Sequence, residues 1–175
     1  MNLQLPITQE IAASLKAGTC VQLTGTLYTA RDAAHKRLMS MLHAGRPLPI
    51  DLKNICLYYT GPCPAAPGEI IGPCGPTTSS RMDAYTPRLI ELGLTAMIGK
   101  GPRSPEVIQA MQTHGAVYFA ATGGAAMLIA ACVRACSVVA FEDLGPEAIH
   151  RLTVENLPLI TAIDAHGNSL YDYTK

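Results

Sequence analysis

The sequence predicts a layered α/β fold, and three observations support this. Short apolar runs alternate with segments of helical periodicity along most of the chain. Serine or threonine stands where several expected helices begin, and glycine stands where they end. Hydrophobic residues make up 49% of the 175 positions, which is enough to fill a core. We therefore expect residues 1–175 to form a single domain, with residues 1–18 as an N-terminal appendage.

The first part of the chain contains two expected helices and two expected strands. Thr8 can cap a short helix that runs to Lys16. Alternating and β-branched residues predict strands over 21–29 and 54–60. Between these strands, helical periodicity predicts a helix over 31–43. Its apolar stripe is expected to contain Ala33, Leu38, Met41 and Leu42.

A long loop separates these elements from a more regular second part. Five prolines and four glycines make residues 61–76 irregular. A hydroxyl cap at Thr77 or Thr78 then begins a helix that reaches about Leu92, and Ser104, followed by proline and glutamate, begins another. The remaining expected elements are strands over 94–98 and 116–120, a helix over 123–134, a strand over 137–141, a helical turn over 147–150 and a last strand over 159–164.

The charge of the chain bears on its partners. Thirteen basic and thirteen acidic side chains cancel, whereas general nucleic-acid binders carry a basic excess, so no nucleic-acid partner is expected. Only 15% of the residues are charged, which indicates either that a partner covers apolar surface or that the core is well filled. The sequence has no targeting region and no apolar run that could span a membrane, so we expect a cytoplasmic protein without membrane contact.

The spacing of six cysteines favours buried apolar side chains over a metal site. They are Cys20, Cys56, Cys63, Cys74, Cys132 and Cys136. A disulfide framework is not expected in the cytoplasm, and the chain contains no CxxC pair. Structural zinc and iron–sulfur sites usually have more closely spaced ligands, so no metal site is expected in this chain.

The segment 72–83 (G-P-C-G-P-T-T-S-S-R-M-D) is the strongest candidate for chemistry. Free amides at a helix start attract anions, and the hydroxyls of Thr77, Thr78, Ser79 and Ser80 can supplement them. Arg81 follows one turn inside the helix, where its guanidinium could bind a carboxylate or phosphate bidentately. The alternative is an ordinary helix cap followed by a surface arginine.

Two further segments place cations at strand ends. Arg31 and Asp32 lie in the first helical turn after a strand, and His35 follows as a minor candidate for a general base. Lys100 stands between two glycines after another strand. Together with Arg81, these cations could receive a small dianion. The sequence shows no complete acid–base set and no metal cage, so it supports half of a site more than a complete enzyme.

Several segments of the chain carry a family resemblance. R-D-A-A-H-K-R over 31–37 and G-P-T-T-S-S-R-M-D over 75–83 are highly specific in combination. Further matching segments are 58–62, 99–101, 114–118, 123–124, 142–149 and 154–168. On these segments, which cover almost the whole chain, the sequence resembles the β subunit of the iron–sulfur hydro-lyases, class I fumarate hydratase and L(+)-tartrate dehydratase.

The resemblance implies a swivelling β/β/α domain and a reversible hydration of a four-carbon dicarboxylate, fumarate or malate first and tartrate next. It implies a [4Fe-4S] cluster that acts as a Lewis acid and is held by a larger α subunit, in an α2β2 assembly. The six cysteines are then not cluster ligands, although Cys74 lies near the site loop.

The resemblance also implies roles for four residues. Arg31, Arg81 and Lys100 match substrate-carboxylate anchors, and Arg81 and Lys100 are also expected to be catalytic. Thr77 matches a threonine that transfers a proton together with an aspartate of the other subunit. Ser79 and Ser80 depart from the residues usual at these positions, which could alter hydrogen bonding near the substrate.

Two other interpretations stay open at this point. The chain could be a stand-alone dicarboxylate-binding or regulatory module without catalysis, although such a binder has no need of Thr77. It could also hold a cluster itself through Cys63, Cys74 and Cys132, which their spacing disfavours.

Overall fold

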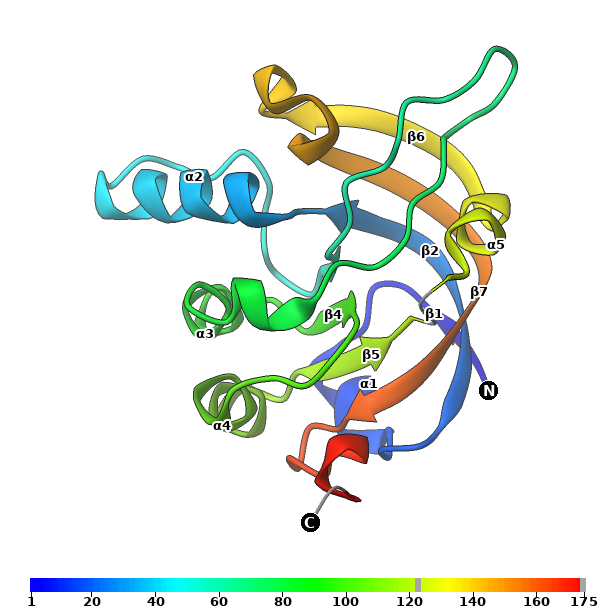
Figure 1. Cartoon of the computed structure of the whole chain (residues 1–175). Helices are drawn as coiled ribbons and strands as arrows, with labels where there is room; N and C mark the ends of the chain where they lie inside the picture. Colours follow the sequence, from blue (N-terminus) through cyan, green and yellow to red (C-terminus); the bar gives the residue numbers. More distant parts are fainter. Residues whose placement is uncertain (122–123, 174–175) are drawn as a thin grey trace.

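The computed structural model describes residues 1–121 and 124–173 as a curved sheet with helices packed against it (Figure 1). The strands are β1 (Asn2–Gln4), β2 (Cys20–Thr29), β3 (Cys56–Tyr58), β4 (Ala96–Gly99), β5 (Val117–Ala120), β6 (Val133–Ala140) and β7 (Ile149–Ile163). The helices are α1 (Gln9–Ser14), α2 (Asp32–His43), α3 (Thr86–Glu91), α4 (Pro105–His114) and α5 (Ala126–Ala131). This mixture confirms the predicted α/β class. None of the helices in the described residues is long and apolar enough to cross a membrane.

The seven strands form one sheet that closes on itself. Their order is β1-β2-β3-β4-β5-β7-β6, and a further pairing of β2 with β7 joins five of them into a ring. β1 to β5 pair in parallel, as expected where helices connect the strands, whereas β7 runs antiparallel to β2, β5 and β6. β2 is long enough to change neighbours on one side, since residues 22–24 pair with β1 and residues 28–29 pair with β3.

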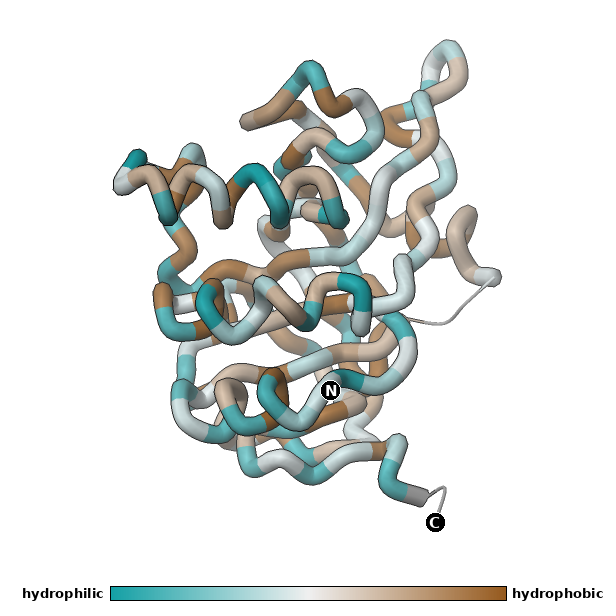
Figure 2. The backbone as a smooth tube through the Cα atoms, turned by 60° about the vertical axis from the view of Figure 1, so that its left-hand side comes forward, coloured by the Kyte–Doolittle hydropathy of each residue, from teal (hydrophilic) through white to brown (hydrophobic). Residues whose placement is uncertain are grey.

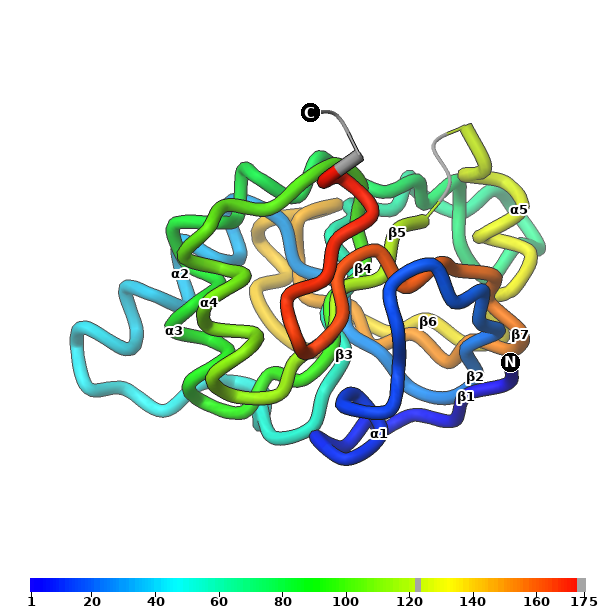
Figure 3. The backbone as a smooth tube through the Cα atoms, turned by 90° about the horizontal axis from the view of Figure 1, so that it is seen from below, coloured from blue at the N-terminus to red at the C-terminus, as the bar shows by residue number. Residues whose placement is uncertain are grey.

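The sheet separates two apolar clusters, because successive strand residues point to opposite faces. Cys56 and Tyr58 of β3 belong to the cluster inside the ring, whereas Leu57 and Tyr59 face the helices. Figure 3 shows α2, α3 and α4 along this outer face. Hydrophobic and hydrophilic positions alternate along the outer helices, as helices with one buried face require (Figure 2).

Local helix signals predicted two helices well. Thr8 caps α1 by accepting a hydrogen bond from the amide of Ile11. Ser104 caps α4 in the same way, and Gly115 ends that helix in the left-handed region at φ 68°. Residues 61–76 are irregular, as their glycines and prolines predicted.

The helix expected from residues 77–92 is wrong. This part of the chain divides into a 3₁₀ segment, Ser79–Met82, and the six-residue α3. Pro87 stands at the second position of α3, where it lacks an amide hydrogen and disfavours the helical conformation of the preceding residue. A new helix therefore begins at Thr86, with the proline in its first turn, and no single helix runs through it.

The stripe expected on α2 is right only in part. The buried residues of this helix are Ala34, His35 and Leu38, whereas Ala33 and Met41 are half-exposed. The ring of His35 packs edge-on against Tyr59, with centroids 5.5 Å apart. The face of α2 that packs against the sheet therefore includes His35 and differs from the expected apolar stripe.

The C-terminal expectations also need correction. The helix over 123–134 is limited to α5, and Gly123 lies outside the described residues. Its last residues instead begin β6 at Val133, and the helical turn over 147–150 is replaced by the start of β7. β7 has fifteen residues, of which the sequence predicted only the end, because Asn156 at φ 52° and Pro158 interrupt its alternation.

The close packing of Gly25 in β2 against Leu5 can be tested by substitution. Gly25 has a φ of 128°, and a Cβ there would lie 2.8 Å from the Cβ of Leu5. We expect Gly25→Ala to lower the free energy of unfolding by about 2 kcal/mol more than Gly45→Ala. Gly45 also has a positive φ, at 63°, but nothing lies within 4 Å of its added Cβ. Urea denaturation of both variants measures the difference, and equal losses would contradict the packing argument.

Candidate active site

The candidate site lies where three neighbouring parallel strands end. β2, β3 and β4 are adjacent and parallel, so their carboxyl ends meet at one edge of the sheet. Arg31 occupies the N-cap position of α2 just after β2, without a hydrogen bond from its side chain to the helix. The amide of Thr77 donates to the carbonyl of Tyr59 just after β3, and Lys100 follows β4 directly. With Arg81 from the next 3₁₀ segment, the topology brings all four predicted residues to this edge.

Residues 77–79 form an extended segment beside the ends of β3 and β4. The amide of Thr77 donates to the carbonyl of Tyr59 at 2.7 Å, and the amide of Ser79 donates to that of Lys100 at 2.9 Å. These two amides are bonded within the chain, so they are not free for an anion as expected of a helix start. The half-buried Thr77 hydroxyl has no hydrogen-bond partner within residues 1–121 and 124–173. It is therefore open to a ligand.

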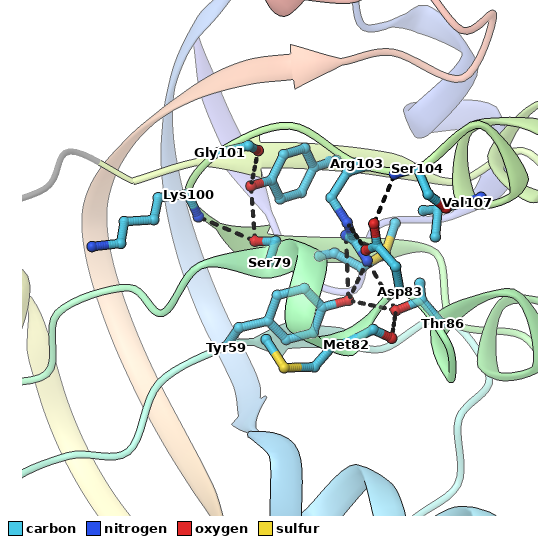
Figure 4. Close-up of polar contacts among 12 residues, drawn as sticks. Tyr59, Ser79, Met82, Asp83, Thr86, Lys100, Gly101, Arg103, Ser104 and Val107 are labelled. Carbon is cyan, nitrogen blue, oxygen red and sulfur yellow. Dashed lines mark hydrogen bonds and ion pairs between the residues drawn. The ribbon is translucent and has the colours of Figure 1, made fainter.

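Two of the three predicted cations are paired with carboxylates. Arg81 donates through Nε and Nη2 to the two oxygens of Asp32, at 3.0 and 2.8 Å. Nε of Arg31 lies 3.4 Å from Glu147 and 3.9 Å from Asp32. Lys100 has no carboxylate partner in the described parts of the chain, and its side chain extends away from the surrounding network (Figure 4). Three positive and two negative side chains leave the site with one net positive charge.

Arg103 forms a buried network beside this edge that the sequence analysis did not assign. Its Nε donates to Asp83 at 2.7 Å and its Nη2 donates to Thr86 at 2.9 Å (Figure 4). The ring centroids of Tyr59 and Tyr118 lie 5.2 and 5.1 Å from its Cζ, within cation–π range. Burial acts to lower the pKa of Arg103, but Tyr59 and Asp83 outweigh this effect, and the pKa is raised. The guanidinium therefore stays charged inside the protein.

Ser79 connects this network to the chain around Lys100. Its hydroxyl accepts a hydrogen bond from the Lys100 amide at 3.1 Å and lies 2.9 Å from the hydroxyl of Tyr118. An added Cβ at Gly99 would collide with Oγ of Ser79, so glycine is required there. Ser79 thus holds the backbone of Lys100 and is fully buried, whereas the neighbouring Ser80 is exposed.

His35 does not serve the site as a general base, so that minor expectation is wrong. Its Nδ1 donates to the carbonyl of Arg31 at 2.8 Å, which leaves Nε2 as the basic atom. Nε2 is buried without a hydrogen-bond partner among the described residues, and the ring lies against Tyr59 and Tyr85. Burial lowers the pKa of His35 to about 4, so the imidazole is neutral at pH 7.

The cysteines do not fit an iron–sulfur cluster held by the described residues. Burial and, to a smaller extent, the nearby Cys136, Cys132 and Cys63 raise the pKa of the Cys74 thiol to about 12. Within residues 1–121 and 124–173, no three histidine, cysteine or acidic side chains converge as a metal site.

The comparisons with known proteins show one matching family. The family model described as the fumarase C-terminus matches residues 1–174. The chain belongs to the fumarase C-terminus family. The three segments with the predicted site residues, 31–37, 75–83 and 99–101, lie inside the match.

Three relatives show how this family member compares in length. A Methanocaldococcus jannaschii protein provisionally named L(+)-tartrate dehydratase subunit beta is 40% identical over 95% of the chain and 88% of its own length. The anaerobic class I fumarate hydratase of Escherichia coli is 38% identical over 93% of the chain, and fumarate hydratase 2 of Leishmania major is 35% identical over 99%. The chain spans only 31% of the length of each of these two fumarate hydratases.

The buried ion pair yields a test of stability. The side chain of Arg103 is fully buried and that of Asp83 is 11% exposed, so Asp83→Ala leaves an unpaired charge in the core. We expect this variant to lower the free energy of unfolding by about 3 kcal/mol. Glu91→Ala is the control, because it breaks an exposed pair with Arg88 and should change the value by less than about 0.5 kcal/mol. Similar losses in urea denaturation would show that Arg103 does not depend on Asp83.

The buried imidazole predicts a pH dependence of stability. The unfolded chain binds a proton at His35 near pH 6.5, whereas the folded chain binds it only near pH 4. Between these values the unfolded state holds more protons, so folding stability falls as the pH is lowered, by up to about 3 kcal/mol. His35→Gln should remove this part of the pH dependence, and His43→Gln, at the exposed end of α2, should keep it. Unfolding measured from pH 7 to pH 4 would contradict the account if both variants kept the same slope.

Proposed function

We propose that the chain is the β-type subunit of a hydro-lyase that adds water to, or removes it from, a four-carbon dicarboxylate. Fumarate or malate is the first candidate substrate, and tartrate is the next. The observation that carries the proposal is the open hydroxyl of Thr77 at the same sheet edge as Arg31, Arg81 and Lys100, in a chain of the fumarase C-terminus family. The names of the relatives support the same reaction class.

In this proposal the cations bind the substrate and stabilise developing charge. Removal of a proton beside a carboxylate builds negative charge on it, which fixed guanidinium and ammonium groups stabilise. Lys100 can contact a ligand without losing an existing ion pair, since it has none within the described residues. Thr77 moves the proton together with an aspartate of the partner, because a threonine hydroxyl is a poor base on its own.

A larger partner subunit is part of the proposal. This chain corresponds to about one third of the fumarate hydratases it resembles, so the rest of the site would come from a second chain in an α2β2 assembly. When held there, a [4Fe-4S] cluster would supply a Lewis acid for the substrate hydroxyl. We also infer that this chain is a swivelling β/β/α domain, which places its site against that partner.

One exposed apolar face supports such a partner. Leu128, Met127, Ile70 and Val138, which are 70%, 61%, 51% and 46% exposed, come from α5, the 61–76 loop and β6. Ile70 and Val138 line a cavity of about 430 Å³ that also contacts Pro146. An added Cβ at Gly61 would lie 3.0 Å from both Pro146 O and Arg31 Cδ. The apolar face is therefore continuous with the candidate site, and a chain that covers it can reach Arg31.

A stand-alone dicarboxylate-binding module is the second candidate function. The described residues offer three cations and the open Thr77 hydroxyl at this edge, and the carboxylates beside them, Asp32 and Glu147, are paired with the arginines. A binder needs only the cations. The two functions differ in whether loss of the Thr77 hydroxyl abolishes an activity or leaves ligand binding unchanged.

The deciding experiment is co-expression with a larger chain that corresponds to the remainder of the fumarate hydratases, followed by anaerobic purification. We expect activity on fumarate and malate, or on a tartrate, only when both chains are present. Thr77→Ala and Arg81→Ala should lower kcat/KM by about 100-fold or more without loss of assembly.

Matched controls separate the site from general damage. Thr113→Ala removes an exposed hydroxyl on α4, and Arg88→Ala removes an exposed arginine on α3, and both should keep full activity. A stable complex without activity on any of these acids would reject the substrate class. Full hydration by the isolated chain without iron would reject the shared site.

A further inference from the structure

We propose that Asp32 is a positioning residue that orients the carboxylate-binding arginines of the proposed hydro-lyase site. The inference rests on the proposed function, because it concerns how Arg81 and Arg31 present themselves to a dicarboxylate. Asp32 is the first residue of α2 and lies 34% exposed at the carboxyl edge of the sheet. It would act through the two arginines and not on the substrate itself.

Asp32 holds Arg81 by one side of its guanidinium. The two bonds, at 3.0 and 2.8 Å, use Nε and Nη2. A guanidinium has five N–H donors, so the end formed by Nη1 and the second hydrogen of Nη2 remains available. This end can bind a substrate carboxylate bidentately while Asp32 keeps its side of the fork. The carboxylate therefore sets the direction in which Arg81 faces a ligand.

The same carboxylate contributes to the placement of Arg31. Oδ2 of Asp32 lies 2.8 Å from Nη2 of Arg81 and 3.9 Å from Nε of Arg31, so one oxygen stands between two positive groups. Glu147 lies on Arg31 Nε at 3.4 Å, and Gly61 limits the space beside its Cδ and Nη1. Asp32 thus offsets the repulsion between two guanidiniums that must bind the same anion.

The position of Asp32 on α2 suits this role. A carboxylate in the first turn is favoured by the helix dipole, and the twelve-residue α2 is anchored by buried Ala34 and Leu38. Arg81 comes from a separate segment, 49 residues away along the chain. The pair therefore fixes Arg81, whose own 3₁₀ segment is short, to the longer helix α2.

The chain contains a matched pair that serves as a control. Arg37 of α2 and Asp143 also form a bidentate pair, here through Nη1 and Nη2 at 2.6 and 2.8 Å, and this pair is also exposed. The guanidinium of Arg37 binds the Asp143 carboxylate and lies over the ring of Phe141. Arg37 is not one of the proposed substrate anchors. Asp143→Asn therefore reports what the loss of an exposed bidentate arginine–aspartate pair does without touching the arginines of the site.

The test compares the steady-state kinetics of Asp32→Asn and Asp143→Asn in the two-chain complex, with fumarate or the acid it is found to use. For Asp32→Asn we expect kcat to fall by about tenfold or more, because the anchors lose their orientation. KM should rise by no more than about threefold, because the site gains one unit of positive charge that attracts the dianion. Asp143→Asn should match the wild type in both constants.

Two kinetic outcomes would overturn the inference. A lower KM with unchanged kcat would show that Asp32 competes with the substrate for Arg81. Unchanged constants in both variants would show that the pair is an ordinary surface contact.

A crystal structure of the Asp32→Asn chain tests the placement without any activity. We expect the Arg81 guanidinium to leave its present position, and an unchanged Arg81 would contradict the inference. If the wild-type complex hydrates none of the acids, the proposed function fails, and this structure still decides whether Asp32 orients Arg81.

Discussion

The buried guanidinium of Arg103 is the interaction on which the candidate site depends. It is bound to Asp83 and Thr86 and lies over the rings of Tyr59, which follows β3, and of Tyr118 in β5. Asp83 in turn accepts a hydrogen bond from the Ser104 amide at 2.7 Å, which fixes the start of α4. Since a charge inside a protein is stable only when its donors are satisfied, this network holds the short 3₁₀ segment of Arg81 and the turn after Lys100 in one arrangement.

The positive and negative side chains of the candidate site nearly cancel, which limits how strongly this chain alone can attract a dianion. Carboxylates from the start of α2 and from residue 147 accompany the two arginines, so only one positive charge is unopposed by this chain. A dianion would then need further stabilisation from outside the chain, and a cavity lined by exposed Ile70 and Val138 reaches Pro146, which lies beside Gly61 and Arg31. Half a site beside an uncovered apolar face is a consistent arrangement for a subunit that is completed by a partner.

Local signals explain what could be predicted from the sequence, and long-range contacts explain the rest. The Ser104 cap and Gly115 define α4 within a few residues, and the sequence places Arg31 and Lys100 after strands, as the structure has them. The pairing of Arg81 with Asp32 depends on packing between segments 49 residues apart, which no local pattern shows. Arg103 stands in a Gly/Pro-rich turn, where an arginine is usually exposed, and its burial needs two rings from other parts of the chain.

The most direct measurement of the central claim is a structure of the assembled two-chain complex with a four-carbon dicarboxylate bound. The account predicts that the ligand lies between the chains, with its carboxylates within hydrogen-bonding distance of Arg31, Arg81 or Lys100 and with the Thr77 hydroxyl beside its carbon skeleton. A ligand held wholly by the partner, with these four side chains in solvent, would contradict the account.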